Sequence, residues 1–164
     1  MSVVKTLQRQ RTVRLPCTRV VTWNVNSIKA RSAVVARWLA AERPDLLLLQ
    51  ETKCSDEAFP RRDFEDLGYR IETVGQKSYN GVAILSRAPF TVERRRLPDD
   101  SDDNDARYIE AVVELPTEGQ RKHQPLRVVS LYLPNGNPAG SESFLHKIDW
   151  MMQLIGHAPA PKEN

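Results

Sequence analysis

Cysteine is scarce in this sequence, which has only Cys17 and Cys54 among its 164 residues. Two cysteines are too few for the disulfide framework that stabilises many small secreted domains, so such a scaffold is excluded. The same scarcity favours a reducing, cytoplasmic setting. No apolar run approaches the roughly 20 residues that a membrane-spanning helix requires, and the sequence therefore argues against a transmembrane role.

Acidic residues are absent from the first 41 positions, which carry eight of the 24 Lys and Arg residues. All 21 acidic residues follow, together with the remaining basic ones. This asymmetry hints at a polyanionic partner, although a formal net charge of +3 cannot establish one. A composition of 40% hydrophobic and 27% charged residues is that of an ordinary globular protein, and the length predicts one domain.

Three segments are expected along the chain. Residues 1–18 are basic and lack a hydrophobic period, which predicts a solvated N-terminal extension. Residues 19–155 carry the patterned part of the sequence and form the expected domain. Residues 156–164 are expected to be an irregular C-terminal tail, because Pro159 and Pro161 cannot continue a helix.

The patterned part opens with a predicted strand, helix and strand. Arg19–Asn26 is rich in β-branched and aromatic residues and predicts a strand, after which Ser27 can cap a helix that runs to about Ala41. Leu46–Leu49 is a continuous apolar run, typical of a strand buried on both faces. These elements predict a βαβ unit with two parallel strands. The expected apolar stripe of the helix consists of Ala30, Val34 and Trp38.

The remaining pattern favours a mixed α/β sheet without internal repeats. The expected elements are a short helix over Phe59–Leu67, strands near Tyr69–Val74, Gly81–Ser86, Thr91–Arg95, Arg107–Leu115 and Leu126–Leu133, and a helix from Glu142 to about Ile155. The acidic run at Asp99–Asp105 resembles a calcium-binding loop only loosely, and we interpret it as a solvated hairpin loop.

Polar side chains stand where three of the predicted strands end. Asn24 ends the first strand, Glu51 follows the second, and Tyr132 lies at the end of a later one, shortly before Asn135. Ligands of α/β sheets bind beyond the carboxyl ends of parallel strands, and one carboxylate with an amide suits a Mg²⁺ ion that keeps several waters. Polar residues end strands in most proteins, however, so the spacing alone leaves a purely structural role open.

Five motifs follow one another in a characteristic order. They are Trp23–Arg31 (WNVNSIKAR), Pro44-Asp45 with Gln50–Cys54 (QETKC), Gly75–Ala83 (GQKSYNGVA), Asp105–Tyr108 (DARY) and Tyr132–Gly136 (YLPNG). This series resembles the first half of exonuclease III, the bacterial branch of the apurinic/apyrimidinic endonuclease family. That family belongs to the endonuclease/exonuclease/phosphatase superfamily, and the resemblance covers about residues 19–155.

The resemblance implies a fold and an activity. The fold is the deoxyribonuclease I-like four-layer α/β sandwich, of which this chain would hold the first half. The activity is Mg²⁺-dependent phosphodiester hydrolysis in DNA repair, with Mn²⁺ as an alternative metal. The implied substrates are duplex DNA with abasic sites and DNA 3′ ends, and the implied location is the bacterial nucleoid in the cytoplasm.

The resemblance also implies roles for individual residues. Glu51 would bind the metal, and Asn24 would support the metal and the phosphate. Tyr132 would contact the scissile phosphate, with Asn135 as a further ligand nearby. The residues that fall in segments resembling the family's DNA-facing loops are Lys29, Arg31, Lys53, Gln76, Lys77 and Tyr79.

Two motifs of the family's second half are absent from this sequence. It contains neither a Gly-Asp-x-Asn segment, which would supply the Asp that activates water, nor a Ser-Asp-His segment, whose His contacts the phosphate. We therefore expect this chain alone to be inactive or weak. We also expect an uncovered apolar sheet face, which would favour aggregation, self-association or pairing with a complementing polypeptide. A non-catalytic DNA-binding fragment, a gene remnant and a phosphatase of the same superfamily remain alternatives.

Overall fold

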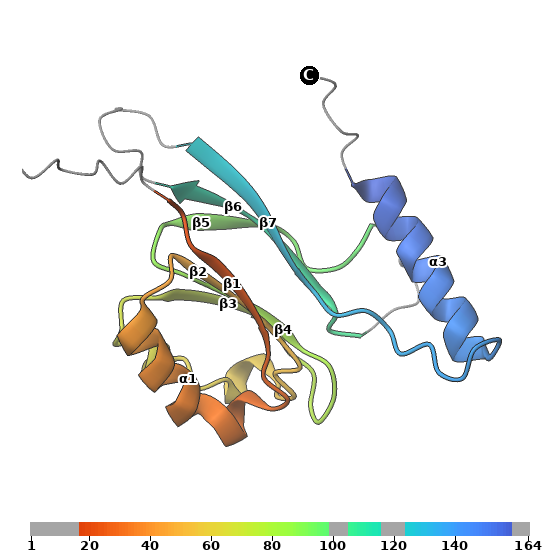
Figure 1. The fold of residues 1–164 in the computed structure, drawn as a ribbon, viewed down its shortest axis with the longest axis horizontal. Coiled ribbons are helices and arrows are strands. Elements are labelled where there is room, and N and C mark those ends of the chain that lie inside the picture. Colours follow the sequence, from red (N-terminus) through yellow and green to blue (C-terminus); the bar gives the residue numbers. More distant parts are fainter. Residues whose placement is uncertain (1–16, 99–104, 116–123, 159–164) are drawn as a thin grey trace, which may run out of the picture.

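The computed structural model describes residues 17–98, 105–115 and 124–158, which form two β-sheets with helices on their outer faces (Figure 1). The chain begins with β1 (Val20–Asn24), α1 (Ile28–Glu42) and β2 (Leu46–Gln50), and the two strands pair in parallel. The hydroxyl oxygen of Ser27 accepts a hydrogen bond from the Ala30 N–H at 3.5 Å and caps α1. The predicted βαβ unit and its cap are confirmed.

Two antiparallel strands complete the first sheet. β4 (Val82–Ser86) pairs with β2, and β3 (Arg70–Val74) pairs with β4, giving the strand order β1-β2-β4-β3. The connection from β2 to β3 holds a short 3₁₀ helix, η1 (Asp56–Ala58), and one turn of α-helix, α2 (Arg62–Glu65). The helix expected over residues 59–67 is therefore shorter than predicted.

The second sheet is a simple antiparallel meander followed by a helix. Its order is β5-β6-β7, and its elements are β5 (Phe90–Arg94), β6 (Tyr108–Leu115), β7 (Gln124–Leu131) and α3 (Glu142–His157). α3 runs two residues past its expected end, and both prolines of the tail follow it. The basic segment 1–16 and the acidic segment 99–104 lie outside the described residues.

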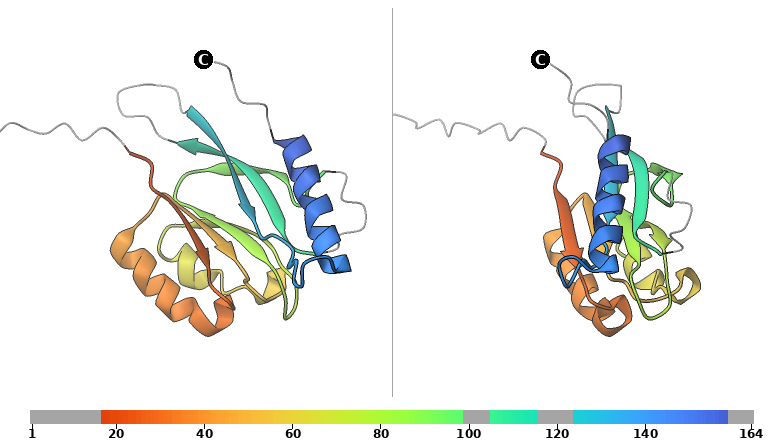
Figure 2. Two further views of the ribbon diagram at one scale, coloured as in Figure 1. Left: turned by 45° about the vertical axis from the view of Figure 1, so that its right-hand side comes forward. Right: turned by 90° about the vertical axis from the view of Figure 1, so that its right-hand side faces the viewer.

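The two sheets pack face to face, with α1 and α3 on opposite sides of the pair (Figure 2). The shared core is aliphatic and includes Leu46, Leu48, Val82 and Ile84 of the first sheet and Ile109, Ala111, Val113 and Val128 of the second. One polar bridge crosses it. The buried Ser130 hydroxyl donates to the Leu49 carbonyl at 3.0 Å and accepts from the Gln50 side-chain amide at 3.3 Å.

The buried face of α1 differs from the predicted one. Ile28, Val35 and Leu39 are fully buried against the first sheet, whereas Ala30 and Val34 are exposed. The predicted stripe was wrong because α1 carries two apolar stripes, and the sheet packs against the one with the larger aliphatic side chains. Trp38 is partly buried and meets the Trp23 ring edge-on, with 5.6 Å between ring centroids.

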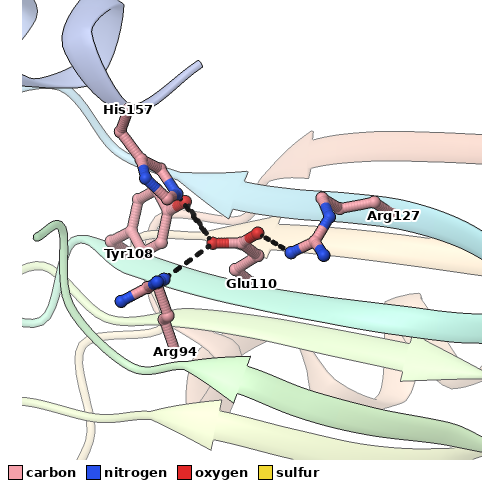
Figure 3. Close-up of polar contacts among 5 residues, drawn as sticks. All are labelled: Arg94, Tyr108, Glu110, Arg127 and His157. Atoms are coloured by element: carbon pink, nitrogen blue, oxygen red, sulfur yellow. Dashed lines mark hydrogen bonds and ion pairs between the residues drawn. The ribbon is translucent and has the colours of Figure 1, made fainter. Parts of the chain in front are cut away.

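A buried carboxylate of the second sheet binds the last residue of α3. Glu110 of β6 is 2% exposed, and its Oε2 lies 2.9 Å from the Tyr108 hydroxyl and 3.0 Å from His157 Nε2. Arg127 binds the other oxygen, Oε1, and Arg94 Nε lies 3.7 Å from Oε2 (Figure 3). Burial raises the pKa of Glu110, but hydrogen bonds from His157, Arg127 and Tyr108 outweigh it and hold the pKa below its ordinary value.

Two apolar surfaces of the described residues, on β1 and on α3, are exposed. Val20 is 44% exposed, because the second sheet does not extend over β1, although its register partner Leu46 is buried. The larger surface lies on α3, where Trp150 packs against the second sheet and the other side of the helix faces outward. This outward side, the α3 seam, consists of Leu145, Ile148, Met152 and Ile155. No helix among the described residues is long and apolar enough to cross a membrane.

Candidate functional site

The ends of the two parallel strands bring an amide and a carboxylate together. Asn24 is the last residue of β1, and Glu51 directly follows β2. Because the strands pair in parallel with Asn24 opposite Gln50, the side chains converge, and Asn24 Nδ2 donates to Glu51 Oε1 at 2.6 Å. The Asn24 side-chain oxygen Oδ1 accepts from the Asn26 N–H at 3.1 Å, which fixes the orientation of the side-chain amide. The structure thus brings together the two residues that the sequence placed at the metal site.

Lys53 completes this cluster from the same loop. Its ammonium group lies 2.9 Å from Glu51 Oε2 and 2.6 Å from the Asn26 side-chain oxygen. The hydrogen bond from Asn24 and then that from Lys53 lower the pKa of Glu51, and they outweigh the opposing effect of burial. Glu51 therefore carries a full negative charge at neutral pH.

A tight backbone turn presents the carboxylate. Glu51 and Lys53 both have positive φ angles, 54° and 53°, which orient their side chains away from the strand direction. The turn is held by Gly81, whose carbonyl accepts from the Thr52 N–H at 3.1 Å. Gly81 has a φ of 91°, and a Cβ there would lie 2.0 Å from Thr52 Oγ1. Only glycine fits this close approach, so the Asn-Gly pair of the third motif supports the loop that carries Glu51.

Tyr132 reaches the same site from the second sheet. It directly follows β7, and its backbone N–H donates to the Arg107 carbonyl at 2.8 Å. Burial raises the pKa of the Tyr132 phenol, and its hydrogen bond with the negatively charged Glu51 raises the pKa further. The phenol is therefore protonated at neutral pH and acts as a hydrogen-bond donor toward Glu51.

Asn135 lies on the loop that leaves Tyr132. Its side-chain oxygen accepts from the Asn137 N–H at 3.2 Å, an arrangement that stabilises the turn. A pocket of about 410 Å³ opens here, with Arg107, Asn135 and His146 among its lining residues. Asn135 is exposed and has no contact with Glu51 among the described interactions, so it borders the site without joining its central cluster.

The residues expected to face DNA fall into three groups: exposed residues, residues bound near Glu51, and Gln76. Lys29, Lys77 and Tyr79 are exposed, and Tyr79 is 70% accessible. Arg31 binds the Asn26 carbonyl, which ties it to the loop after β1. Lys53 pairs with Glu51 as described above.

Gln76 is turned inward. Its amide nitrogen donates to Asp105 at 3.2 Å, and its oxygen accepts from the Asn80 side chain at 2.7 Å and from the Ala106 N–H at 3.3 Å. A glutamine in a Gly-flanked basic loop gave no signal of this internal role. The sequence patterns also predicted no role for Asp105 and Arg107, although both lie in the fourth motif, Asp105–Tyr108. In the structure, Arg107 stacks on Tyr132, with its guanidinium carbon 5.4 Å from the ring centroid.

The donor set suits a hard cation with few protein ligands. Among the described residues, no three His, Cys, Asp or Glu side chains gather closely enough to hold a metal ion. A cation at this site would therefore have one protein carboxylate, Glu51, with Asn24 beside it. Mg²⁺ accepts such a set because it keeps several of its waters. The residues present thus fit Mg²⁺ better than a metal that demands a dense protein cage.

Comparisons with known proteins extend the geometric description. The Endonuclease/Exonuclease/phosphatase family profile matches residues 21–162. Exodeoxyribonuclease III of Haemophilus influenzae is 35% identical over 125 residues, which cover 76% of this chain and 45% of that protein. A Neisseria 3′ phosphatase, NExo, bound to a product DNA hairpin has a TM-score of 0.74 at 35% identity over 85% of this chain and 51% of its own.

An AP endonuclease from Archaeoglobus fulgidus also has a TM-score of 0.74, at 33% identity, and covers 85% of this chain and 50% of its own. The chain thus spans about half the length of the relatives it matches. The matched half contains both sheets of the structure, and the likeness confirms the deoxyribonuclease I-like α/β fold class.

Proposed function

This chain belongs to the Endonuclease/Exonuclease/phosphatase family, and on that premise we propose that its site serves Mg²⁺-dependent hydrolysis of DNA phosphodiesters. The observation that carries the proposal is the convergence of an ionised Glu51 with Asn24 and Tyr132, from three strand ends on two sheets. Exodeoxyribonuclease III and an AP endonuclease are among the relatives, which supports DNA as the substrate.

Each residue of the cluster has a distinct part in this function. Glu51 would hold Mg²⁺, which when bound withdraws electrons from the phosphate and offsets its developing charge. Asn24 keeps the Glu51 carboxylate oriented through the 2.6 Å hydrogen bond. Tyr132, protonated at neutral pH, donates its hydroxyl hydrogen to a phosphate oxygen. Asn135 borders the phosphate from the loop that follows.

The proposed substrates are duplex DNA with abasic sites and DNA 3′ ends, and the proposed location is therefore the nucleoid. A relative named as a 3′ phosphatase with bound product DNA supports action at 3′ ends. The exposed Lys29, Lys77 and Tyr79 would hold the DNA, with Arg31 and Lys53 contributing charge close to the reacting phosphate. Backbone contacts of this kind add affinity without reading a base sequence, which suits a lesion-directed enzyme.

The proposed reaction needs groups that this sequence does not contain. No Gly-Asp-x-Asn or Ser-Asp-His segment is present, so the groups that would activate water and bind the phosphate through His must come from residues beyond this sequence, whether on the same polypeptide or on a complementing one. The α3 seam supports such a partner. Its residues recur at alternating steps of three and four, the spacing that packs one helix alongside another. We propose that a segment equivalent to the unmatched half of the relatives covers the seam.

The decisive experiment incubates the purified chain with duplex DNA that carries an abasic-site analogue, with Mg²⁺ and with a chelator. The same reactions are repeated after adding the unmatched half of NExo as a separate polypeptide. We expect binding without cleavage by the chain alone, and Mg²⁺-dependent cleavage after complementation. Cleavage that persists in chelator contradicts the metal role, and absence of DNA binding contradicts the proposed substrate. Release of inorganic phosphate from 3′-phosphorylated ends would identify the phosphatase reaction.

A matched pair of variants assigns the activity to the site. Glu51→Gln keeps the shape of the side chain and removes its charge, and it should abolish the Mg²⁺-dependent activity. Glu65→Gln makes the same change on the exposed face of α2 and should leave activity unchanged. Equal activity of the two variants would contradict the assignment of Glu51.

A further inference from the structure

Arg107 contacts Tyr132 through both its backbone and its side chain. The Arg107 carbonyl accepts from the Tyr132 N–H at 2.8 Å, which pairs the start of β6 with the end of β7. The guanidinium group lies over the Tyr132 ring, 5.4 Å from the centroid. The Arg107 side chain is only 12% exposed, so its guanidinium group is largely removed from water. Cation–π attraction is stronger there than at an exposed surface.

Asp105 anchors the guanidinium group in this position. Asp105 Oδ2 accepts from Arg107 Nε at 3.0 Å and lies 2.8 Å from the second terminal nitrogen. The remaining terminal nitrogen donates to the Leu133 carbonyl at 3.4 Å. Gln76 donates to the other carboxylate oxygen of Asp105 at 3.2 Å. The planar group is thereby bound along several edges, an arrangement that lysine could not reproduce.

The Tyr132 ring is consequently restrained on its face and at its hydroxyl end. A tyrosine that directly follows a strand can rotate about two side-chain bonds unless its surroundings prevent it. Arg107 occupies one face of the ring, and the hydroxyl group interacts with Glu51. A bound phosphate would meet a phenol that already has its reactive orientation, and such preorganisation lowers the cost of reaching the transition state.

We propose that Arg107 is a positioning residue, which Asp105 holds over the Tyr132 ring so that the phenol points at the phosphate beside Glu51. The catalytic part of this inference rests on the function proposed above. The contacts that carry it are independent of that function, because they belong to the fold of the chain itself. The inference also gives Gln76 a role as the support of Asp105 in place of the expected DNA contact.

The test compares Arg107→Met, Arg107→Lys and a matched control. Arg95→Met removes a similar ion pair, with Glu72 at 2.7 Å, at a place that has no contact with Tyr132. The first readout is the NMR spectrum of the chain with ¹³C-labelled tyrosine rings, with Tyr132→Phe used for assignment. The second is the kcat and KM of abasic-site cleavage by the chain complemented as above.

We expect Arg107→Met to shift and broaden the Tyr132 ring signals and to lower kcat about tenfold while KM stays within about twofold. Arg107→Lys should show smaller changes in the ring signals and in kcat than Arg107→Met, and Arg95→Met should change neither the signals nor kcat. Unchanged Tyr132 signals in Arg107→Met overturn the inference. If that variant does not fold, Asp105→Asn must shift the same signals, and its failure to do so overturns the inference equally. If the complex with the unmodified chain does not cleave DNA, this contradicts the proposed function but not the positioning role, because the Tyr132 ring signals test that role independently.

Discussion

Asn24 and Glu51 are separated by 27 positions in the sequence, yet the Asn24 amide donates to the Glu51 carboxylate at 2.6 Å. Parallel pairing of β1 and β2 creates this contact, because it brings the carboxyl ends of both strands to the same edge of the sheet. The hydrogen bond is the first cause of the lowered Glu51 pKa. It therefore links the register of two strands to the charge of the candidate metal ligand.

Asn24→Leu should weaken Mg²⁺ binding about tenfold, because groups that orient a metal ligand typically contribute 10- to 100-fold in affinity. The variant also removes the main cause of the lowered Glu51 pKa, so that pKa should rise. Isothermal titration calorimetry measures the affinity. Thr22→Val serves as the control. Thr22 lies on the same strand as Asn24, and the variant removes a hydrogen bond to Gln50 of β2. Equal affinities for Mg²⁺ in the two variants would show that Asn24 does not support the site.

Lys53→Met should separate metal binding from DNA binding. Its ammonium group is 2.9 Å from Glu51 Oε2 and competes with a cation for that oxygen, so its removal should raise Mg²⁺ affinity about threefold. DNA affinity should fall, and the slope of log affinity against log salt should decrease by about one. Lys77→Met, in an exposed loop, should change the salt slope similarly without altering Mg²⁺ affinity. Lower Mg²⁺ affinity in Lys53→Met would contradict the competition.

Stability should fall in acid as Glu110 becomes protonated. Its folded-state pKa is below the ordinary value of 4.5, so the carboxylate stabilises the fold above that pH. The contribution is lost as the pH falls through the folded-state pKa. Glu110→Gln should cost about 2–3 kcal/mol at neutral pH, because it leaves Arg127 and His157 without their buried partner. Urea unfolding between pH 3 and 7 measures both effects, and a difference between the two proteins that does not shrink in acid contradicts this role.

The α3 seam should drive association of the isolated chain. The double variant Met152→Gln/Ile155→Lys removes apolar surface that is 62% and 65% exposed, so unfolding free energy should change by less than about 0.5 kcal/mol per site. Light scattering and sedimentation should show less concentration-dependent assembly. Trp150→Ala, on the packed side of α3, should instead cost about 3–5 kcal/mol. Undiminished assembly of the double variant would place the association elsewhere, with the exposed Val20 strand as the next candidate.

The sequence predicted those parts of the molecule that depend on local pattern and on parallel pairing. The run at Leu46–Leu49 and the strand before Asn24 predict two parallel strands, and as neighbours these strands would end at the same edge of the sheet with Glu51 beside Asn24, which the structure confirms. The buried face of α1 was not predictable, because Val34 and Val35 offer two similar stripes and only the sheet distinguishes them.

Polar contacts between loops that are distant in the sequence could not be predicted from sequence patterns either. Gln76 and Asp105 are 29 positions apart and meet only because the loop after β3 lies against the start of β6. Arg107 reaches Tyr132 through the antiparallel pairing of β6 with β7, whose register no turn signal specified. A positively charged residue in such a motif suggests a contact with DNA. Only the three-dimensional structure shows that Arg107 is instead buried over the ring of Tyr132.

Ser130 has a consequence for the whole site. Its hydroxyl joins β7 to the Leu49 carbonyl and the Gln50 amide, two residues before Tyr132 on one sheet and directly before Glu51 on the other. The Ser130 hydrogen bonds therefore help to align the phenol and the carboxylate across the two sheets. A sequence change that let the sheets slide would leave every site residue chemically intact and still dismantle the site. Alignment of the two sheets, as much as the identity of the side chains, determines whether this surface can hold a phosphate.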